Sequence, residues 1–400
     1  MRAIQPRVAY VTTYDSNDVR HWSGLGFFIA KALERHGIEL LRLGPLATIP
    51  SAWLRTKKRF FETSQKKEFH LERDPLVAKS YANQIQRMLR GKDIDAILSP
   101  GTIPISYLQT CVPIAVWTDA TFGGLVGFYP EFSNLSSATL KSGHALERRA
   151  LNNCSLAVYT SNWAAHSAAK TYGLESRKLR VIPFGANIEF ESSWHAVRID
   201  IASRGFSECR LLFLGSDWNR KGGPAAVQLA LKLRESGMPC SLTVIGCSPS
   251  QHLPDLVNVV GFVSKQSPEG IATINRALAT SHFLILPTIA DCVPVVFAEA
   301  FAHGLPVIST NIGGIPSIIS HGKNGFVFNA ENFVTDAANT ILEILCKETR
   351  YTEVCEQSYS DYLEYFNWNV AGRLMKAQLE RICCERHDGI AIEADSAPNR

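Results

Sequence analysis

Two acidic residues stand out because almost everything between them is apolar. Asp291 and Glu299 lie eight positions apart in the stretch DCVPVVFAEA, residues 291–300. If this stretch is helical, the residues one turn away from Glu299 are mainly apolar. A carboxylate on an apolar face costs free energy unless donors hydrogen-bond to it, and the hydroxyls of a sugar or ribose are suitable donors. The apolar surroundings of Glu299 therefore indicate hydroxyl recognition, with an exposed structural glutamate as the alternative.

A short helix is expected to position these two acids. Pro294 suits the first turn of a helix and Gly304, followed by a proline, suits its end, so a helix is predicted over about 294–303. Asp291 would lie just ahead of the first turn. An aspartate there also serves as an ordinary helix cap or dipole partner, which is its alternative role.

A second motif combines glycines with two cations. In GSDWNRKGG, residues 215–223, a predicted strand ends at Gly215 and a helix follows Gly222. Arg220 and Lys221 lie between them. Glycines allow a backbone to approach a ligand closely, a helix N-terminus offers free N–H groups, and cations complement phosphate. The motif outlines a diphosphate site, although the same residues in isolation also describe a turn whose cations face water.

The elements around these motifs alternate between short β-rich runs and helical patterns, and the alternation restarts once. Such alternation predicts parallel sheets covered by helices. Each series opens with a strand, a glycine-containing turn (15–26 and 215–223) and a helix, and ligands of open α/β sheets bind beyond the strand ends where such turns lie. The predicted fold class is α/β with two doubly wound domains. The predicted strands are 8–14, 96–100, 113–118, 156–161, 179–185, 210–215, 241–246, 282–287 and 305–310.

The length also indicates two domains. At 400 residues the chain exceeds the size at which a single core stops growing. The restart of the pattern places the boundary within 190–208, and we divide the chain into residues 1–200 and 201–360. Residues 385–400 lack apolar periodicity and are expected to form a loose tail.

Composition excludes several classes of protein. A formal net charge of +4 is too mild for a nucleic-acid-binding face, and the ten cysteines are scattered without metal-ligand spacing. No run of about 18 apolar residues is present to span a bilayer, and the first residues lack a secretory h-region. A cytoplasmic protein is expected.

Taken together, the motifs resemble the family-4 glycosyltransferases, retaining enzymes of the GT-B fold. The segments that carry the resemblance in the second half are GSDWNRKGG, GFVSK at 261–265 and LPTIADCVPVVFAEAFAHGLPVISTNIGGIPSIISHGKNGFVF at 286–328. The family pattern there is Glu-x7-Glu followed by Ala, a Gly-Leu/Val-Pro-Val strand, Gly-Gly and an Asn-Gly turn. In the first half, WSGLG at 22–26 and VIPFGANIE at 181–189 are similar to family segments.

The resemblance implies an architecture and an activity. The GT-B fold has two Rossmann-like domains facing across a cleft, an N-terminal acceptor-side domain and a C-terminal domain for the nucleotide-sugar donor. Helices at 361–384 would cross back to the first domain. The implied activity is transfer of a sugar from a nucleotide sugar to a glycan, lipid-linked or small-molecule acceptor, with retention at the anomeric carbon. A catalytically impaired, transferase-like protein that binds nucleotide sugars or regulates is the alternative.

The resemblance assigns the residues of the sugar-donor site. Glu299 would bind the ribose hydroxyls, and Asp291 would bind hydroxyls of the transferred sugar. The N–H groups of Cys292 and Val293 would lie near the sugar and phosphate at a helix N-terminus. Lys221 matches the family lysine that binds the diphosphate.

The sequence departs from the family at three of these places. The family acid at position 291 is normally glutamate, and Asp291 is one methylene shorter. Ser216 occupies the position of the usual arginine, for which Arg220 is a hypothetical substitute. A histidine that contacts the sugar in many members aligns with Thr118; the next residue, Asp119, is our candidate for a polar contact with the acceptor, with capping of a turn as its alternative role.

Backbone contacts are expected to supply the remaining binding interactions. Gly24 would approach the phosphate or the sugar from the first domain, and the glycines of the 215–223 motif would approach the diphosphate. The base would be recognised by backbone around Phe262–Lys265, with Phe262 and Val263 as the candidate contacts. The leaving diphosphate would be stabilised by the two cations and the helix N-terminus, so neither a metal nor another cofactor is required.

The acceptor and its location are less defined. The stretch SAWLRTKKRFFETSQKKEF, residues 51–69, mixes cations with Trp53, Phe60 and Phe61. It is predicted either as a solvated helix with one packed face or as a helix that lies on the inner face of an anionic membrane and presents a lipid-linked acceptor.

Overall fold

The computed structural model describes residues 6–49, 51–188, 193–250 and 252–395. The chain divides into two compact units. The first consists of Met1–Phe184 together with Trp368–Arg400, and the second of Gly185–Asn367. The predicted pair of α/β domains is therefore present, and each unit has a parallel sheet of its own.

The first unit is built on a six-stranded parallel sheet with the order β2-β1-β3-β4-β5-β6. Its central strands are buried on both faces, as expected for a parallel sheet covered by helices. The strands are β1 Arg7–Val11, β2 Glu39–Leu43, β3 Ala96–Ser99, β4 Ile114–Thr118, β5 Leu156–Tyr159 and β6 Leu179–Val181. The helices of its first segment are α1 Leu25–Arg35, α2 Ala52–Ser64, α3 Pro75–Leu89, α4 Phe122–Leu125, α5 Ser137–Asn153 and α6 Asn162–Tyr172.

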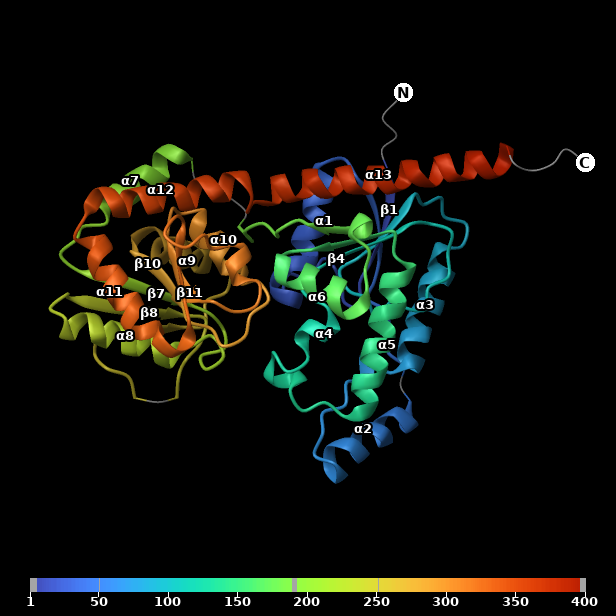
Figure 1. The fold of residues 1–400 in the computed structure, drawn as a ribbon, viewed down its shortest axis with the longest axis horizontal. Helices are drawn as coiled ribbons and strands as arrows, with labels where there is room; N and C mark the ends of the chain where they lie inside the picture. The colour runs from blue at the N-terminus through green and yellow to red at the C-terminus, as the bar shows by residue number, and fades with distance from the viewer. Residues whose placement is uncertain (1–5, 50, 189–192, 251, 396–400) are drawn as a thin grey trace, which may run out of the picture. The chain divides into compact units, whose positions relative to one another are not determined.

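The last helix, α13 (Trp368–Asp395), completes the first unit by packing beside α1 (Figure 1). Lys376 Nζ donates to the His36 carbonyl at 2.9 Å, and Trp368 stacks on Phe28 with ring centroids 6.1 Å apart. A Cβ atom on Gly372 would lie 2.8 Å from the His36 ring, so glycine permits the close approach of the two helices. The predicted return of the chain to the first domain is thus observed.

The second unit has a six-stranded parallel sheet with the order β12-β11-β10-β7-β8-β9. The strands are β7 Cys209–Leu214, β8 Cys240–Ile245, β9 Val257–Gly261, β10 Phe283–Leu286, β11 Val307–Thr310 and β12 Gly325–Phe328. The helices are α7 Trp194–Ser203, α8 Gly223–Glu235, α9 Pro268–Thr280, α10 Val295–Phe301, α11 Phe333–Leu345 and α12 Glu348–Glu364.

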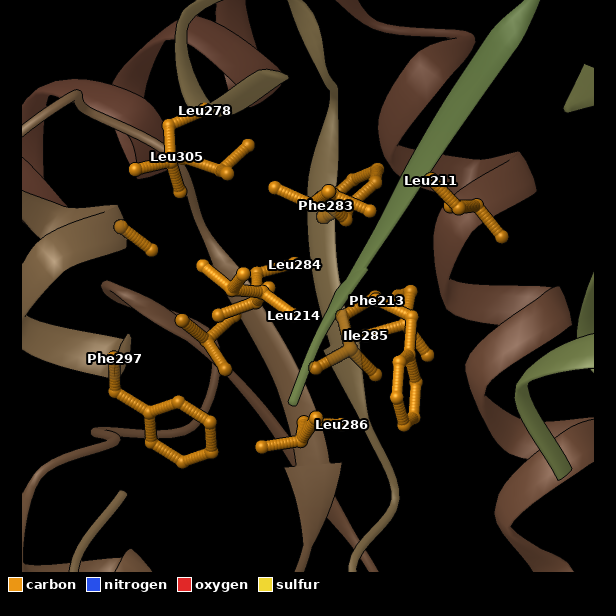
Figure 2. Close-up of a cluster of buried hydrophobic side chains, with 14 of the residues drawn as sticks. Leu211, Phe213, Leu214, Leu278, Phe283, Leu284, Ile285, Leu286, Phe297 and Leu305 are labelled. Carbon is orange, nitrogen blue, oxygen red and sulfur yellow. The ribbon is translucent and has the colours of Figure 1, made fainter. Parts of the chain in front are cut away.

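The core of the second unit is centred on its two middle strands, β7 and β10. The side chains of Phe283, Leu284, Ile285 and Leu286 are fully buried, and Figure 2 shows them beside side chains of β7. Phe297 of α10 is fully buried in the same cluster. Burial of one such side chain stabilises the fold by roughly 1.5–3 kcal/mol relative to its exposure. The strands that carry the predicted site loops are therefore part of the buried core of this unit.

The boundaries of the units differ from the predicted ones. The chain changes unit at 184/185 rather than 200/201, because α7 buries Val197 and Ile201 in the core of the second unit. α12 also packs in the second unit, and the return to the first begins at Trp368 rather than at 361. The predicted loose tail at 385–400 is helical to Asp395, since α13 continues, and residues 396–400 lie outside the described residues.

Candidate functional site

The predicted diphosphate motif lies where the strand order of the second sheet reverses. The chain adds β8 and β9 beside β7, then returns to place β10 on the other side of β7. Ligands of open α/β sheets bind at such a reversal, beyond the carboxyl ends of the strands. The loops after β7 and β10 meet there. Gly222 has a φ of +80°, and a Cβ atom on it would lie 1.9 Å from the Pro287 carbonyl oxygen, so the contact requires glycine.

Three of the predicted site residues converge at this point. Lys221 Nζ forms an ion pair with Asp291 Oδ2. Arg220 Nη1 lies 3.5 Å from the same oxygen. The Asp291 side chain is only 8% exposed, and both cations are largely buried. The structure thus joins the cationic motif and the first acid of the acidic motif in one cluster.

The orientation of Arg220 is fixed by hydrogen bonds from both loops. Its Nη1 donates to the Ala290 carbonyl at 2.8 Å, and its backbone N–H donates to Asp217 Oδ1 at 3.0 Å. Its carbonyl accepts from Thr288 Oγ1 and from the Ile289 N–H, each at 2.9 Å. Arg220 is therefore held at the reversal point by the loop after β10, whereas a solvated turn would leave its side chain free.

The second acid is also ion-paired. Glu299 on α10 has a side chain that is 2% exposed, and Lys265 Nζ donates to its two oxygens at 2.5 and 2.6 Å. Lys265 lies in the segment that follows β9, and its side chain is 45% exposed. The apolar setting predicted for Glu299 is confirmed by this burial. The sequence had indicated only backbone around residues 262–265, so the side-chain contact of Lys265 was missed.

The helix that carries Glu299 is shorter than predicted. It runs over Val295–Phe301 rather than 294–303, with Pro294 at its N-cap and no side chain capping it. The alternative role of Asp291 as a helix cap therefore has no support in the geometry; its carboxylate is engaged by cations instead.

The other predicted residues of this unit lie around the same edge of the sheet. Cys292 is buried and Val293 partly buried in the segment that enters α10. Gly215 directly follows β7, and a Cβ atom on it would lie 3.2 Å from Lys221 Cγ. Phe262 and Val263 follow β9; Phe262 is 81% exposed and Val263 is partly buried.

The far end of α10 is held by a residue that the sequence did not single out. Arg204 is 1% exposed, and its guanidinium donates to the carbonyls of His303 and Gly304, each at 2.8 Å. These bonds satisfy two carbonyls of the turn that directly follows α10. Burial, reinforced by the charge of Arg204, lowers the pKa of His303 to about 4. The acid on α10 is thereby placed on a helix that is fixed at its C-terminal end.

The predicted acceptor residues belong to the first unit, where they line a cavity of about 180 Å³. The strand order of the first sheet reverses between β1 and β3, and the cavity is lined by residues that follow β1, β3 and β4. Thr118 and Asp119, at the end of β4, are both part of its wall. Asp119 also raises the pKa of Tyr14, although burial of this phenol is the larger cause.

Gly24 lies in a strained turn beside this cavity. It has a φ of +84° and forms the N-cap of α1. The two preceding residues, Trp22 and Ser23, have φ values of 48° and 54°, a region that non-glycine residues seldom occupy. Such strain persists where the surroundings enforce it and is concentrated at functional sites. Trp22 lines the cavity and also packs edge-on against Phe184.

The basic aromatic stretch contains α2, in which one residue is buried and much of the surface is exposed. Leu54 is buried, whereas Trp53 and Phe60 are 57% and 52% exposed. Lys57 pairs with Asp74 at 2.7 Å. Among the described residues, no helix is long and apolar enough to cross a membrane. Membrane contact through α2 and a cytoplasmic location remain predictions.

Comparison with known sequences finds a family match within the second unit. Residues 208–347 match the model of the family Glycosyl transferases group 1. The chain is similar to a D-inositol 3-phosphate glycosyltransferase of Paenarthrobacter aurescens, with 22% identity over 56% of this chain and 56% of the relative. The amylovoran biosynthesis glycosyltransferase AmsK of Erwinia amylovora is 26% identical over 43% of this chain and 45% of the relative. The chain thus spans about half the length of these curated relatives.

Comparison with solved structures covers nearly the whole chain. The sucrose-phosphate synthase of Thermosynechococcus elongatus superposes with a TM-score of 0.65 and 16% identity, covering 94% of this chain and 98% of that one. Anabaena HepE in complex with UDP-glucose superposes with a TM-score of 0.60 and 15% identity, covering 94% and 100%. At such identities the likeness establishes the fold, and the predicted GT-B fold class is confirmed.

Proposed function

We propose that this chain, whose residues 208–347 form a Glycosyl transferases group 1 domain, moves a sugar from a nucleotide-sugar donor to an acceptor hydroxyl. The observation that carries the proposal is the convergence of Lys221, Arg220 and Asp291 at the reversal point of the second sheet. Two cations beside one buried acid, at the carboxyl ends of parallel strands, suit a diphosphate with a sugar attached.

When the sugar donor binds, the cations of these ion pairs can exchange the carboxylate for phosphate as their partner. Asp291 pairs with both cations, and Asp217 pairs with Arg220 as well. Diphosphate oxygens would take over Lys221 and Arg220, because charge-assisted hydrogen bonds to phosphate are strong. The carboxylate of Asp291 would then accept hydrogen bonds from hydroxyls of the sugar. Its shorter side chain, compared with the family glutamate, would select how closely that sugar approaches.

Glu299 would bind the ribose in the same manner. Its burial leaves the carboxylate dependent on donors, and Lys265 is the donor that the described structure provides. Because Lys265 is nearly half exposed, it can turn aside at modest cost while ribose hydroxyls donate to Glu299. The UDP-glucose named with the Anabaena neighbour supports a nucleotide sugar as the ligand.

For the reaction itself we propose retention at the anomeric carbon without an enzymic nucleophile. The bond between C1 of the sugar and the diphosphate oxygen breaks, and the acceptor oxygen bonds to C1 from the same face. The acceptor proton passes to the departing diphosphate. Negative charge that develops on the diphosphate would be stabilised by Lys221 and Arg220, which are already oriented. In this scheme the two cations stabilise the leaving diphosphate, and no metal is needed.

A panel of nucleotide sugars tests the proposal. The purified chain is mixed with UDP-, GDP- and ADP-sugars, and the melting temperature and the release of nucleotide are followed with and without EDTA. At least one donor should raise the melting temperature and release nucleotide, with the same rate in EDTA.

Three results would count against parts of this account. A folded chain that no nucleotide sugar stabilises would refute the transferase function. Stabilisation without release, with a wide set of acceptors present, would favour a binding or regulatory protein. A rate abolished by EDTA and restored by a divalent cation would refute the metal-free scheme.

A further inference from the structure

The cavity of the first unit contains two buried charged side chains that the proposed reaction does not use. Arg73, which precedes α3, is 9% exposed, and Glu147 on α5 is 2% exposed. Both line the cavity, together with Thr102 and Asp119. The cavity lies beyond the carboxyl ends of β1, β3 and β4, the edge at which open α/β sheets bind ligands.

The guanidinium of Arg73 is positioned by aromatic rings rather than by hydrogen bonds. Its central carbon lies 4.3 Å from the centroid of the Phe122 ring, and Phe122 lines the same cavity. Within the described part of the chain, Nε and Nη1 of Arg73 have no hydrogen-bond partner. Burial lowers the pKa of Arg73, and the charge of Glu147 partly opposes this effect. These two buried nitrogens are therefore able to donate hydrogen bonds to a bound molecule.

Glu147 is also only partly satisfied. Its Oε2 accepts a hydrogen bond from Thr102 Oγ1 at 2.5 Å, while Oε1 has no hydrogen-bond partner among the described residues. Burial raises the pKa of Glu147; the Thr102 bond, the charge of Arg73 and the nearby Phe122 N–H act in the opposite direction. A buried acceptor without a hydrogen-bond partner is destabilising, so this oxygen can also accept a hydrogen bond from a bound molecule.

The combination of orphan groups selects the chemistry of that partner. A hydroxyl both donates and accepts, so neighbouring hydroxyls can satisfy the donors of Arg73 and the acceptor of Glu147 together. A phosphate or carboxylate would suit Arg73 but would face the carboxylates of Glu147 and Asp119. An ammonium group would face Arg73. The mixture of charges therefore favours a neutral ligand with several hydroxyls.

The size and walls of the cavity limit the ligand further. About 180 Å³ is less than the roughly 300–1,000 Å³ of sites that enclose drug-sized ligands, so a single ring fits better than a chain. Trp22 and Phe122 give the wall apolar faces, against which the C–H face of a ring can pack.

We propose that this cavity binds the acceptor through one neutral polyhydroxylated ring, with Arg73 and Glu147 contacting adjacent hydroxyls. The ring is a sugar or cyclic polyol, either free or at the end of a larger molecule. Calling it the acceptor rests on the proposed transferase function; the binding of the ring does not. Arg73 and Glu147 then determine which hydroxyl pattern is accepted.

The test measures ring binding separately from binding of the sugar donor. Wild-type chain is titrated, without nucleotide, with glucose, galactose, mannose, N-acetylglucosamine and myo-inositol, and with glucose 6-phosphate and glucuronate as charged counterparts. Saturation-transfer NMR gives the affinities. At least one neutral ring should bind more tightly than its charged counterpart.

Variants connect this binding to the two side chains. Glu147→Gln and Arg73→Lys should each weaken the preferred ring at least tenfold, while the melting shift caused by a nucleotide sugar is retained. Glu72→Gln removes the same charge from the exposed residue beside Arg73 and should alter ring affinity less than twofold. If Glu147→Gln does not fold, Thr102→Val, which removes the donor to Glu147, replaces it.

The possible failures are distinguishable. Absence of binding by every neutral ring, tighter binding of a charged counterpart, or unchanged affinity in folded Glu147→Gln and Arg73→Lys would overturn the inference. If no nucleotide sugar binds the wild type, the transferase function fails, while the ring titration still decides what the cavity binds.

Discussion

The two units present the same sheet edge to a ligand but treat their buried charges differently. In each, candidate residues follow strands that flank the reversal of strand order. In the second unit both acids are ion-paired, Asp291 with Lys221 and Glu299 with Lys265. In the first, Arg73 and Glu147 keep polar atoms without hydrogen bonds in the described structure.

The difference teaches what each edge can bind. Paired opposite charges can be separated by a ligand that is itself charged, because phosphate replaces the acid as the partner of the cations. Orphan donors and acceptors around a small cavity are instead completed by hydroxyls. On the two proposals above, one architecture provides a site for a charged nucleotide sugar and a site for a neutral ring.

The largest effect is expected from removal of the central cation of the second unit. Lys221→Ala should lower kcat/KM by about 100- to 1,000-fold, because a preoriented charge at the leaving group is lost. Lys232→Ala is the matched control, since Lys232 is half exposed on α8. Steady-state kinetics with the preferred sugar donor measure both. Equal rates in the two variants would remove Lys221 from the site.

The loop contact that forms this site is expected to depend on one glycine. Gly222→Ala should destabilise the chain by about 3 kcal/mol, because it adds a clash with the Pro287 carbonyl to the strain of a left-handed residue. Gly237→Ala has nearly the same φ, +84°, with open space around the new Cβ atom, and should cost only about 1 kcal/mol. Denaturant unfolding compares them, and similar losses would show that the close approach is unimportant.

A smaller effect is expected from the second acid. Glu299→Gln should weaken sugar-donor binding roughly tenfold or more, as hydrogen bonds to a charged group are worth about 1.5–3 kcal/mol. Glu235→Gln, an exposed glutamate at the end of α8, serves as the control. Calorimetric titration gives both dissociation constants. An unchanged constant in Glu299→Gln would leave ribose recognition to other residues.

The last effect appears only at acid pH and concerns the support of α10. Folding holds the pKa of His303 at about 4, below its unfolded value near 6.5, so its contribution to stability is fully present above pH 6.5 and is lost as the pH falls toward 4. The loss should be on the order of 2 kcal/mol at pH 4.5. Scanning calorimetry should show that the melting temperature falls less steeply with decreasing pH in His303→Gln than in the wild type. The exposed His166→Gln is the control, and parallel pH profiles for all three would contradict the account.

Much of the fold could be predicted because central parallel strands are continuous apolar runs. The expected runs at 96–100, 113–118 and 282–287 correspond to β3, β4 and β10. The strands that were missed, β2, β9 and β12, all lie at sheet edges. Their burial is incomplete: polar residues interrupt the apolar runs of β2 and β9, and β12 is only four residues long.

The site was predictable where its residues are close in sequence and not where the fold alone joins them. Lys221, Asp291 and Glu299 belong to two compact motifs with recognisable spacing. Arg73 and Glu147 come from separate elements, 74 positions apart (147 − 73), and nothing in their local sequence indicates a shared cavity. For Lys265 the sequence likewise predicted only a backbone contact. Its side-chain contact with Glu299 was missed because the two residues lie 34 positions apart.

The most direct test of the central claim is whether the cations of the second unit bind a diphosphate. Calorimetric titration of the wild type and of Lys221→Ala with a nucleoside diphosphate and its monophosphate, using the base of the preferred sugar donor, isolates this contact. The account predicts that the wild type binds the diphosphate at least tenfold more tightly than the monophosphate and that Lys221→Ala loses this preference. Equal affinity for both nucleotides in the wild type, or an intact preference in Lys221→Ala, would contradict it.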